Sequence, residues 1–176
     1  MPSTDTLIRA LHADDAAAFQ ALRLRGLRED PVAFASSAEE EQGEALQAVA
    51  ARLQGQGAGA VFGAWRSGVL VGVAGIQRES MRKLAHKAFL WGMYVAPEAR
   101  RGGLGRQLVR MALDHARDVL GVRQVNLGVH AHNAPALALY LGLGFEAFGL
   151  ERGCMVVDGR DVDEVHMACR VGVDRA

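Results

Sequence analysis

The sequence predicts an α/β domain of the α+β type, with a mixed but mainly antiparallel sheet of six to seven strands and about four flanking helices. Three observations lead to this fold class. Apolar runs of strand length alternate with segments of helical periodicity. A short turn joins two neighbouring strand segments, and elsewhere a helical segment lies between two apolar strands. No repeat or Pro-rich linker divides the 176 residues, so we expect a single domain over residues 1–176.

The first strand and the first helix follow from hydrophobic pattern and helix-stop signals. Thr6–Ala10 is expected to form a short strand. A helix follows that Asp14 or Asp15 can cap. It ends before Pro31, because the residue preceding a proline is disfavoured in the helical region.

A second helix is expected to open at Ser36 or Ser37. Ser37 and Glu40 have the spacing of a capping box, in which each side chain bonds the other residue's backbone N–H. The apolar residues of this helix recur at i, i+3, i+4 and i+7, at Leu46, Val49, Ala50 and Leu53.

The remaining elements alternate strands with helices. Val61–Trp65 and Val69–Gln77 are separated by a short turn and predict an antiparallel hairpin. The helix Gly103–Leu120 lies between the apolar strands Ala88–Val95 and Gln124–His130, which implies a right-handed parallel crossover. The chain then continues with a helix at Ala134–Leu143 and strands near Phe145–Leu150 and Val162–Arg170.

Composition excludes several classes of partner. Twenty basic and twenty acidic residues give a net charge of zero, which argues against a nucleic-acid-binding protein. Cys154 and Cys169 lack the Cys or His spacing of a zinc site. Met1–Ala10 does not resemble a secretory signal, and no run of 18 apolar residues predicts a membrane span. We therefore expect a cytoplasmic protein with no metal, no nucleic-acid partner and no membrane partner.

The segment between the third apolar strand and the next helix carries the chemistry. Its sequence from Val95 to Arg106 is V-A-P-E-A-R-R-G-G-L-G-R. Glycines let a backbone approach a ligand closely, and a helix start supplies free N–H groups and partial positive charge. Residues 100–106, here called the cradle, are thus suited to a pyrophosphate. The alternative is a glycine-rich turn with solvated arginines.

Two motifs resemble those of the GNAT superfamily of N-acetyltransferases. The cradle has that superfamily's acyl-CoA motif of Arg or Gln, two residues, Gly, one residue and Gly or Ala. Asn133–Phe145 is similar to its downstream motif, Asn, two residues, Ala, two residues, Leu-Tyr, three residues and Gly-Phe. The resemblance covers nearly the whole chain. It implies a V-shaped splay, at a β-bulge, between the two central parallel strands.

The resemblance also implies that acetyl-CoA is the cosubstrate. Backbone N–H groups near the end of the strand before the cradle would face the pantetheine arm, the cradle would surround the pyrophosphate, and an Asn side chain would contact the CoA arm. The implied cofactor-binding residues are Met93, Tyr94, Val95, Arg100, Arg101, Gly102, Gly103, Leu104, Gly105, Arg106, Asn133 and Tyr140.

Two catalytic roles are expected. Tyr140, in the downstream motif, would protonate the departing CoA thiolate, although a packed helix aromatic is the alternative. Many members carry a Glu base on the strand before the cradle, but Ala88–Met93 contains no acid. His86 is the candidate base, with His130 and Glu39–Glu41 as further alternatives.

The predicted function is transfer of an acetyl group from acetyl-CoA to an amine by direct attack in a ternary complex. The acceptor would be a small-molecule amine or a peptide N-terminus, and the resembled family is often dimeric. One alternative is a non-catalytic acyl-CoA sensor of the same fold, favoured by the missing strand carboxylate. Another is a module that binds a different diphosphate nucleotide.

Overall fold

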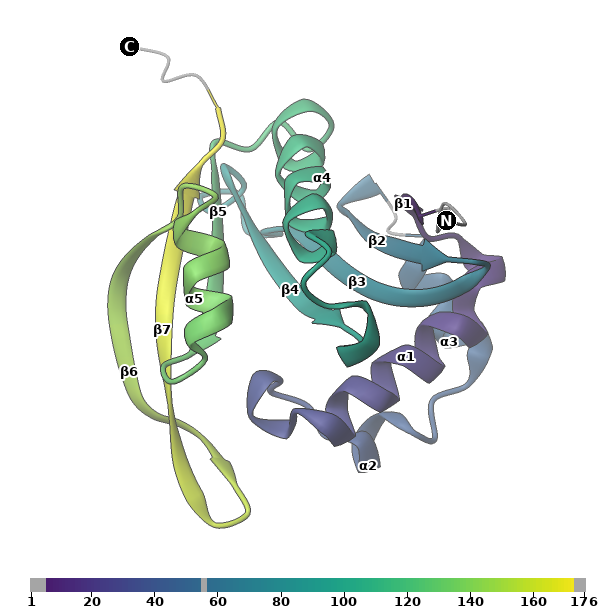
Figure 1. Cartoon of the computed structure of the whole chain (residues 1–176). Coiled ribbons are helices and arrows are strands. Elements are labelled where there is room, and N and C mark those ends of the chain that lie inside the picture. The colour runs from purple at the N-terminus through teal and green to yellow at the C-terminus, as the bar shows by residue number, and fades with distance from the viewer. Residues whose placement is uncertain (1–5, 55–56, 173–176) are drawn as a thin grey trace.

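The computed structural model describes residues 6–54 and 57–172. These residues form one seven-stranded sheet in the order β1-β2-β3-β4-β5-β7-β6, in which only the β4–β5 pair is parallel (Figure 1). The mixed, mainly antiparallel sheet predicted from the sequence is confirmed. The strands are β1 (Thr6–Ala10), β2 (Gly59–Arg66), β3 (Val69–Arg78), β4 (Lys87–Val95), β5 (Gln124–His130), β6 (Glu146–Val157) and β7 (Arg160–Arg170).

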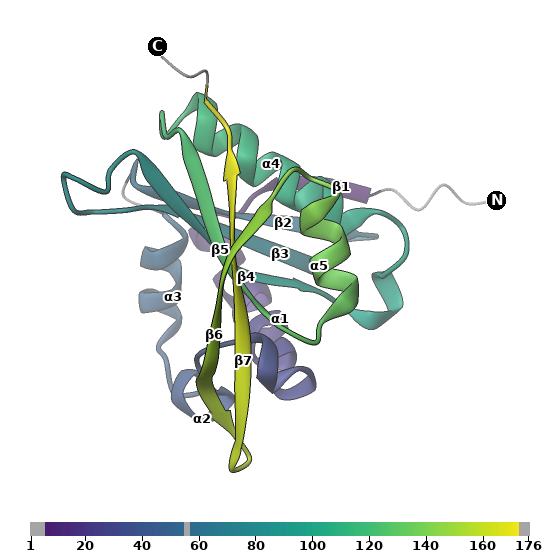
Figure 2. The ribbon, with the colours of Figure 1, turned by 90° about the vertical axis from the view of Figure 1, so that its left-hand side faces the viewer.

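Helices cover both faces of the sheet. Figure 2 shows α1, α2 and α3 on one side and α4 and α5 on the other. Successive residues of β3 face opposite sides of the sheet. Val73 lies opposite Tyr94, which packs on Gly26 of α1. Its neighbour Gly72 lies close to Leu108 of α4. The helices are α1 (Ala16–Glu29), α2 (Ala38–Glu41), α3 (Leu46–Leu53), α4 (Leu104–Asp118) and α5 (Ala134–Leu141).

The expected second helix is two helices. The capping box forms as predicted, since the Glu40 N–H donates to Ser37 Oγ and the Ser37 N–H donates to Glu40 Oε2. The helix nevertheless stops after Glu41, and α3 begins at Leu46. Gly43 lies in the interruption, and glycine is about 1 kcal/mol less favourable than alanine inside a helix. A single helix through this segment was therefore wrong.

The last two strands are longer than expected. The sequence predicts an end near Leu150, but β6 runs to Val157 and pairs with β7 through a turn at Asp158 and Gly159. Both turn residues have positive φ, 50° and 73°, which is the conformation of a two-residue hairpin turn. Asp-Gly is a strong hairpin signal that the sequence interpretation missed. The resulting hairpin extends beyond the rest of the sheet (Figure 1).

The two parallel strands separate, as predicted. Register pairing between β4 and β5 covers three residue pairs and ends at Phe89 and Asn126. Beyond that point β4 continues to Val95 and β5 to His130. The register of β4 against β3 shifts near Gly92, whose φ of 64° marks an irregular backbone. This bulge turns β4 away from β5 and leaves backbone groups free for a ligand.

Candidate active site

A cavity of about 670 Å³ occupies the gap between β4 and β5, and we call it the cleft. At one end it is lined by the cradle and the start of α4, together with α5. At the other end it is lined by Asp30, Ala33 and Phe34, which follow α1 on the opposite face of the sheet. The cleft therefore passes through the sheet, and two different ligands can approach its centre from opposite faces.

The cradle has the geometry that an anion requires. Gly103 is the N-cap of α4 with a φ of 75°, a left-handed conformation in which a side chain is strained. Its side-chain position is open, with Gln107 Nε2 as the nearest atom at 4.0 Å. A Cβ added to Gly105 would lie 3.0 Å from Met93 Cε, so the helix start is close-packed on β4. The first residues of α4, whose N–H groups have no acceptor within the helix, line the cleft.

Two of the arginines also hold the cradle in place. Arg100 donates a hydrogen bond to the Val95 carbonyl at 2.8 Å. Arg106 donates to the Gly142 carbonyl at 3.1 Å, which joins α4 to the end of α5. Both line the cleft, as does Arg101, so their positive charge lies beside the helix N-terminus. That charge favours an anion in an otherwise neutral protein.

The structure brings most of the predicted cofactor-binding residues together. The lining includes Met93, Tyr94, Val95, Arg100, Arg101, Gly103, Leu104, Gly105, Arg106, Asn133 and Tyr140. Gly102 is not part of the lining, and a Cβ there would lie 3.6 Å from Arg66 Nη2. The Asn133 side chain accepts a hydrogen bond from the Ala136 N–H at 3.2 Å and so caps α5. Its expected contact with a CoA arm stays a prediction.

The side chain of Tyr94 has a structural role on the face of the sheet that α1 covers. Its hydroxyl donates a hydrogen bond to Glu29 of α1. Burial and this hydrogen bond raise the pKa of Tyr94 to about 12. Tyr94 is also among the residues that line the cleft, and its side chain ties β4 to α1.

Tyr140 lies in the wall of the cleft and is 6% exposed. Its ring meets Phe145 edge to face, with 5.6 Å between centroids. Burial raises the pKa of Tyr140 to about 12, because a phenolate is poorly solvated there. The hydroxyl therefore keeps its proton at neutral pH and is available as an acid.

Of the two histidines considered as the base, only one lines the cleft. His86 precedes β4 at the paired end of the strands, where its carbonyl accepts a hydrogen bond from the Arg123 N–H, and it does not line the cleft. The geometry gives no support to His86 as the base. His130 does line the cleft, near its wide end.

Two residues of the acidic run Glu39–Glu41 are engaged in other contacts. Glu41 forms an ion pair with Arg23 at 2.8 Å. Burial works to raise the pKa of Glu41, but hydrogen bonds from Arg23 and Ser36 outweigh it and hold that pKa below its usual value. Glu40 is part of the capping box. Glu40 thus stabilises the start of α2, and Glu41 joins the end of α2 to α1.

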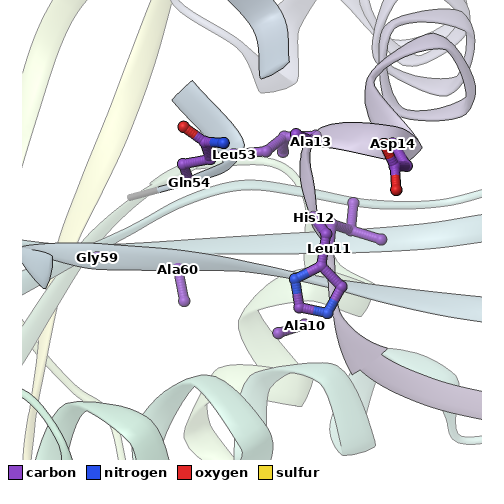
Figure 3. Close-up of a pocket in the computed structure, with 9 residues that line it drawn as sticks. All are labelled: Ala10, Leu11, His12, Ala13, Asp14, Leu53, Gln54, Gly59 and Ala60. Atoms are coloured by element: carbon purple, nitrogen blue, oxygen red, sulfur yellow. The ribbon is translucent and has the colours of Figure 1, made fainter. Parts of the chain in front are cut away.

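A second hollow of about 410 Å³ lies between the end of α3 and the start of β2 (Figure 3). Its polar side chains come from His12, Asp14 and Gln54, and none of its lining residues belongs to the cleft. Within residues 6–54 and 57–172, no three His, Cys, Asp or Glu side chains are grouped as metal ligands would be. No helix in this described part is long and apolar enough to cross a membrane.

Comparison with known proteins gives a consistent picture. The chain is 41% identical over 99 residues to N-alpha-acetyltransferase RimI of Mycobacterium tuberculosis, which covers 56% of this chain and 60% of that protein. It is 36% identical over 88 residues to the ribosomal protein bS18-alanine N-acetyltransferase of Escherichia coli, which covers 49% of this chain and 58% of the relative. The chain thus spans less than two thirds of the length of these curated relatives.

The fold is shared with solved structures along nearly its full length. The acetyltransferase yncA of Salmonella typhimurium, solved with acetyl-CoA, has a TM-score of 0.81 at 22% identity and covers 98% of this chain and 97% of that one. Residues 24–145 match the family described as acetyltransferase (GNAT). Because that match includes the cradle, the splayed strands and α5, the chain belongs to the acetyltransferase (GNAT) family.

Proposed function

We propose that the protein transfers an acetyl group from acetyl-CoA to an amino group by direct attack in a ternary complex. The observation that carries this proposal is the cleft itself, which connects an anion-binding helix start on one face of the sheet to an open mouth on the other. Such a passage lets a thioester and an amine meet without a covalent enzyme intermediate.

The residues of the cleft fit the donor. The open side-chain position at Gly103 and the free N–H groups of α4 suit a diphosphate, whose charge the nearby guanidinium groups complement. The splay leaves backbone N–H and C=O groups of β4 free for the amides of a pantetheine arm. When bound, acetyl-CoA supplies the activated acyl group.

The chain's own residues then supply orientation and a proton. The cradle fixes one end of the donor, and the two strands direct its arm towards the point where they pair, at Phe89 and Asn126. Tyr140 lies in the cleft wall, and in this proposal it gives its proton to the departing sulfur. Its raised pKa keeps that proton in place until the sulfur becomes basic enough to accept it.

We further propose that the acceptor is the N-terminal amino group of a peptide or protein. The Mycobacterium relative is named as an N-alpha-acetyltransferase and the Escherichia relative as acting on an alanine of a ribosomal protein. The far mouth of the cleft, at Asp30 and Phe34, is open to a chain end. A small-molecule amine is the other outcome that the test distinguishes.

The proposal is tested by release of free CoA thiol from acetyl-CoA with a panel of acceptors. The panel spans short peptides with Ala, Ser or Gly at the N-terminus, the same peptides with a blocked N-terminus, polyamines, amino acids and aminoglycosides. We expect release with free peptides and none with blocked ones. Release with polyamines or aminoglycosides alone would overturn the peptide assignment. Silence across the panel, with acetyl-CoA binding in calorimetry, would favour a sensor.

A further inference from the structure

The carboxylate of Glu164, on β7, lies beside the wall of the cleft. Gly128 of β5 lines the cleft. A Cβ added at Gly128 would lie 2.1 Å from Glu164 Oε1 and 2.8 Å from Glu164 Oε2. The β7 residue Glu164 therefore places its carboxylate in the space that a side chain on Gly128 would otherwise fill. Glycine at this position allows the carboxylate to approach the cleft wall.

The location matches the reacting end of the cleft. The last paired residue of β5 is Asn126, so Gly128 is two residues, or about 7 Å, beyond the apex of the splay. The cradle lies at the opposite end of β4, after Val95. A donor held by its diphosphate at the cradle directs its thioester towards this apex. His130 is two residues farther from the apex than Gly128.

The carboxylate also faces the side from which the acceptor enters. The strand register places Phe89, Asn126 and Gly128 on one face of the sheet, together with Gln77 of β3 and His166 of β7. Val73 is on the same face as Gln77, and its partner Tyr94 packs on α1. This is the face on which the segment after α1 lines the cleft mouth.

The Glu164 side chain is partly exposed and has several polar neighbours. Its side chain is 26% exposed, and His166 Nδ1 lies 3.6 Å from its Oε1. The Nε2 atom of His166 is 2.9 Å from Oε2 of Glu151 on β6. His130 of β5 is the register partner of Glu164. On β6, burial and then the charge of Glu164 raise the pKa of the Cys154 thiol. Glu151 is also the register partner of Glu164 on β6, so a second carboxylate faces it across this strand pair.

We propose that Glu164 is the general base that removes a proton from the acceptor ammonium group, directly or through one water. This inference rests on the proposed function. Glu164 does not itself line the cleft, but its carboxylate lies against Gly128, which does. One bridging water can therefore connect this carboxylate to an amine in the cleft. The acid that is missing from β4 is thus supplied by β7.

The proton count closes with this assignment. The ammonium gives one proton to Glu164, and the free amine forms the N–C bond to the acetyl carbon. The C–S bond breaks, and the sulfur takes the proton of Tyr140. The new amide nitrogen loses its second proton, which restores Tyr140 through solvent. Glu164 then releases its proton, so each turnover yields one amide, one CoA thiol and one proton.

The test is Glu164→Gln, which keeps the size of the side chain and removes its basicity. We expect kcat to fall at least about 100-fold, the lower end of the usual contribution of a general base, with acetyl-CoA Kd within about twofold of wild type. The rise of kcat with pH on the acidic side should also disappear. Glu151→Gln is the matched control, since Glu151 also contacts His166 but lies on β6, which β7 separates from β5 and Gly128. It should stay within about twofold of wild type.

A rescue experiment separates basicity from packing. Gly128→Asp in a Glu164→Ala background returns a carboxylate to nearly the same place from β5. We expect kcat of the double variant to be at least about tenfold higher than that of Glu164→Ala alone, because the new carboxylate restores a base near the original position. Full activity of Glu164→Gln, or equal losses in Glu164→Gln and Glu151→Gln, would overturn the inference and leave the proposed function standing. A folded double variant that binds acetyl-CoA without recovery would also overturn it. A wild-type protein that is inactive on every acceptor would overturn both the proposed function and the assignment of Glu164.

Discussion

Glutamate in place of Gly103 is expected to weaken acetyl-CoA binding about 30- to 150-fold in Kd. A side chain at a φ of 75° strains the N-cap of α4, and a carboxylate there competes with the diphosphate for the same N–H groups. Like charges about 4 Å apart near a protein surface repel by up to about 4 kcal/mol, and solvent exposure of the mouth reduces this to about 2–3 kcal/mol. Calorimetric titration of the folded variant measures the change.

Gly121→Glu is the matched control for this substitution. Gly121 also has a positive φ, 64°, with no atom within 4 Å of an added Cβ, and it follows the other end of α4. The control carries the same charge change and a similar backbone strain. We expect its acetyl-CoA Kd to equal that of wild type within about twofold, as for a surface change away from the site. Equal affinities in Gly103→Glu and wild type would remove the cradle from the donor site.

Phenylalanine in place of Tyr140 is expected to lower kcat about 100-fold while acetyl-CoA affinity stays close to wild type. The substitution removes one hydroxyl and keeps the ring that packs edge to face on Phe145. A general acid contributes about 10²–10⁴ to rate, and its loss affects the reaction more than the binding of the ground state. Steady-state kinetics together with calorimetry separates the two effects.

The pH dependence gives Tyr140 a second signature. A folded-state pKa of about 12 means that the phenol stays protonated above pH 10, where an ordinary tyrosine is half ionised. Wild-type kcat should therefore hold up to about pH 10 and decline only as pH approaches 12. Wild-type turnover in Tyr140→Phe at every pH would exclude this residue as the acid and leave it a packing residue.

Much of the fold was accessible from the sequence because local signals agree with the tertiary arrangement. The bounds of β1 and β5 are the predicted ones, since an apolar run between clear breaks is a strong strand signal. The splay was inferred through a family resemblance, and the three-pair register between β4 and β5 confirms it. No periodicity in either strand encodes where two parallel neighbours part.

The errors have physical causes. Ser37 and Glu40 cap a helix whose length they do not determine, and Gly43 ends it early. Asp158 and Gly159 form the turn of a hairpin whose exposed strand β6 lacks strong alternation. The base that we propose depends on a long-range contact. Gly128 and Glu164 are 36 positions apart, and only the pairing of β5 with β7 brings the carboxylate over the glycine.

A single-turnover experiment tests the central claim most directly. Protein in excess over acetyl-CoA carrying a labelled acetyl group is mixed with the best peptide of the panel, and CoA thiol, labelled peptide and labelled protein are followed together. We expect thiol and labelled peptide to appear one to one at the same rate, with no label on the protein. Label on the protein before the peptide, or bound acetyl-CoA that yields neither product, would contradict direct transfer within the cleft.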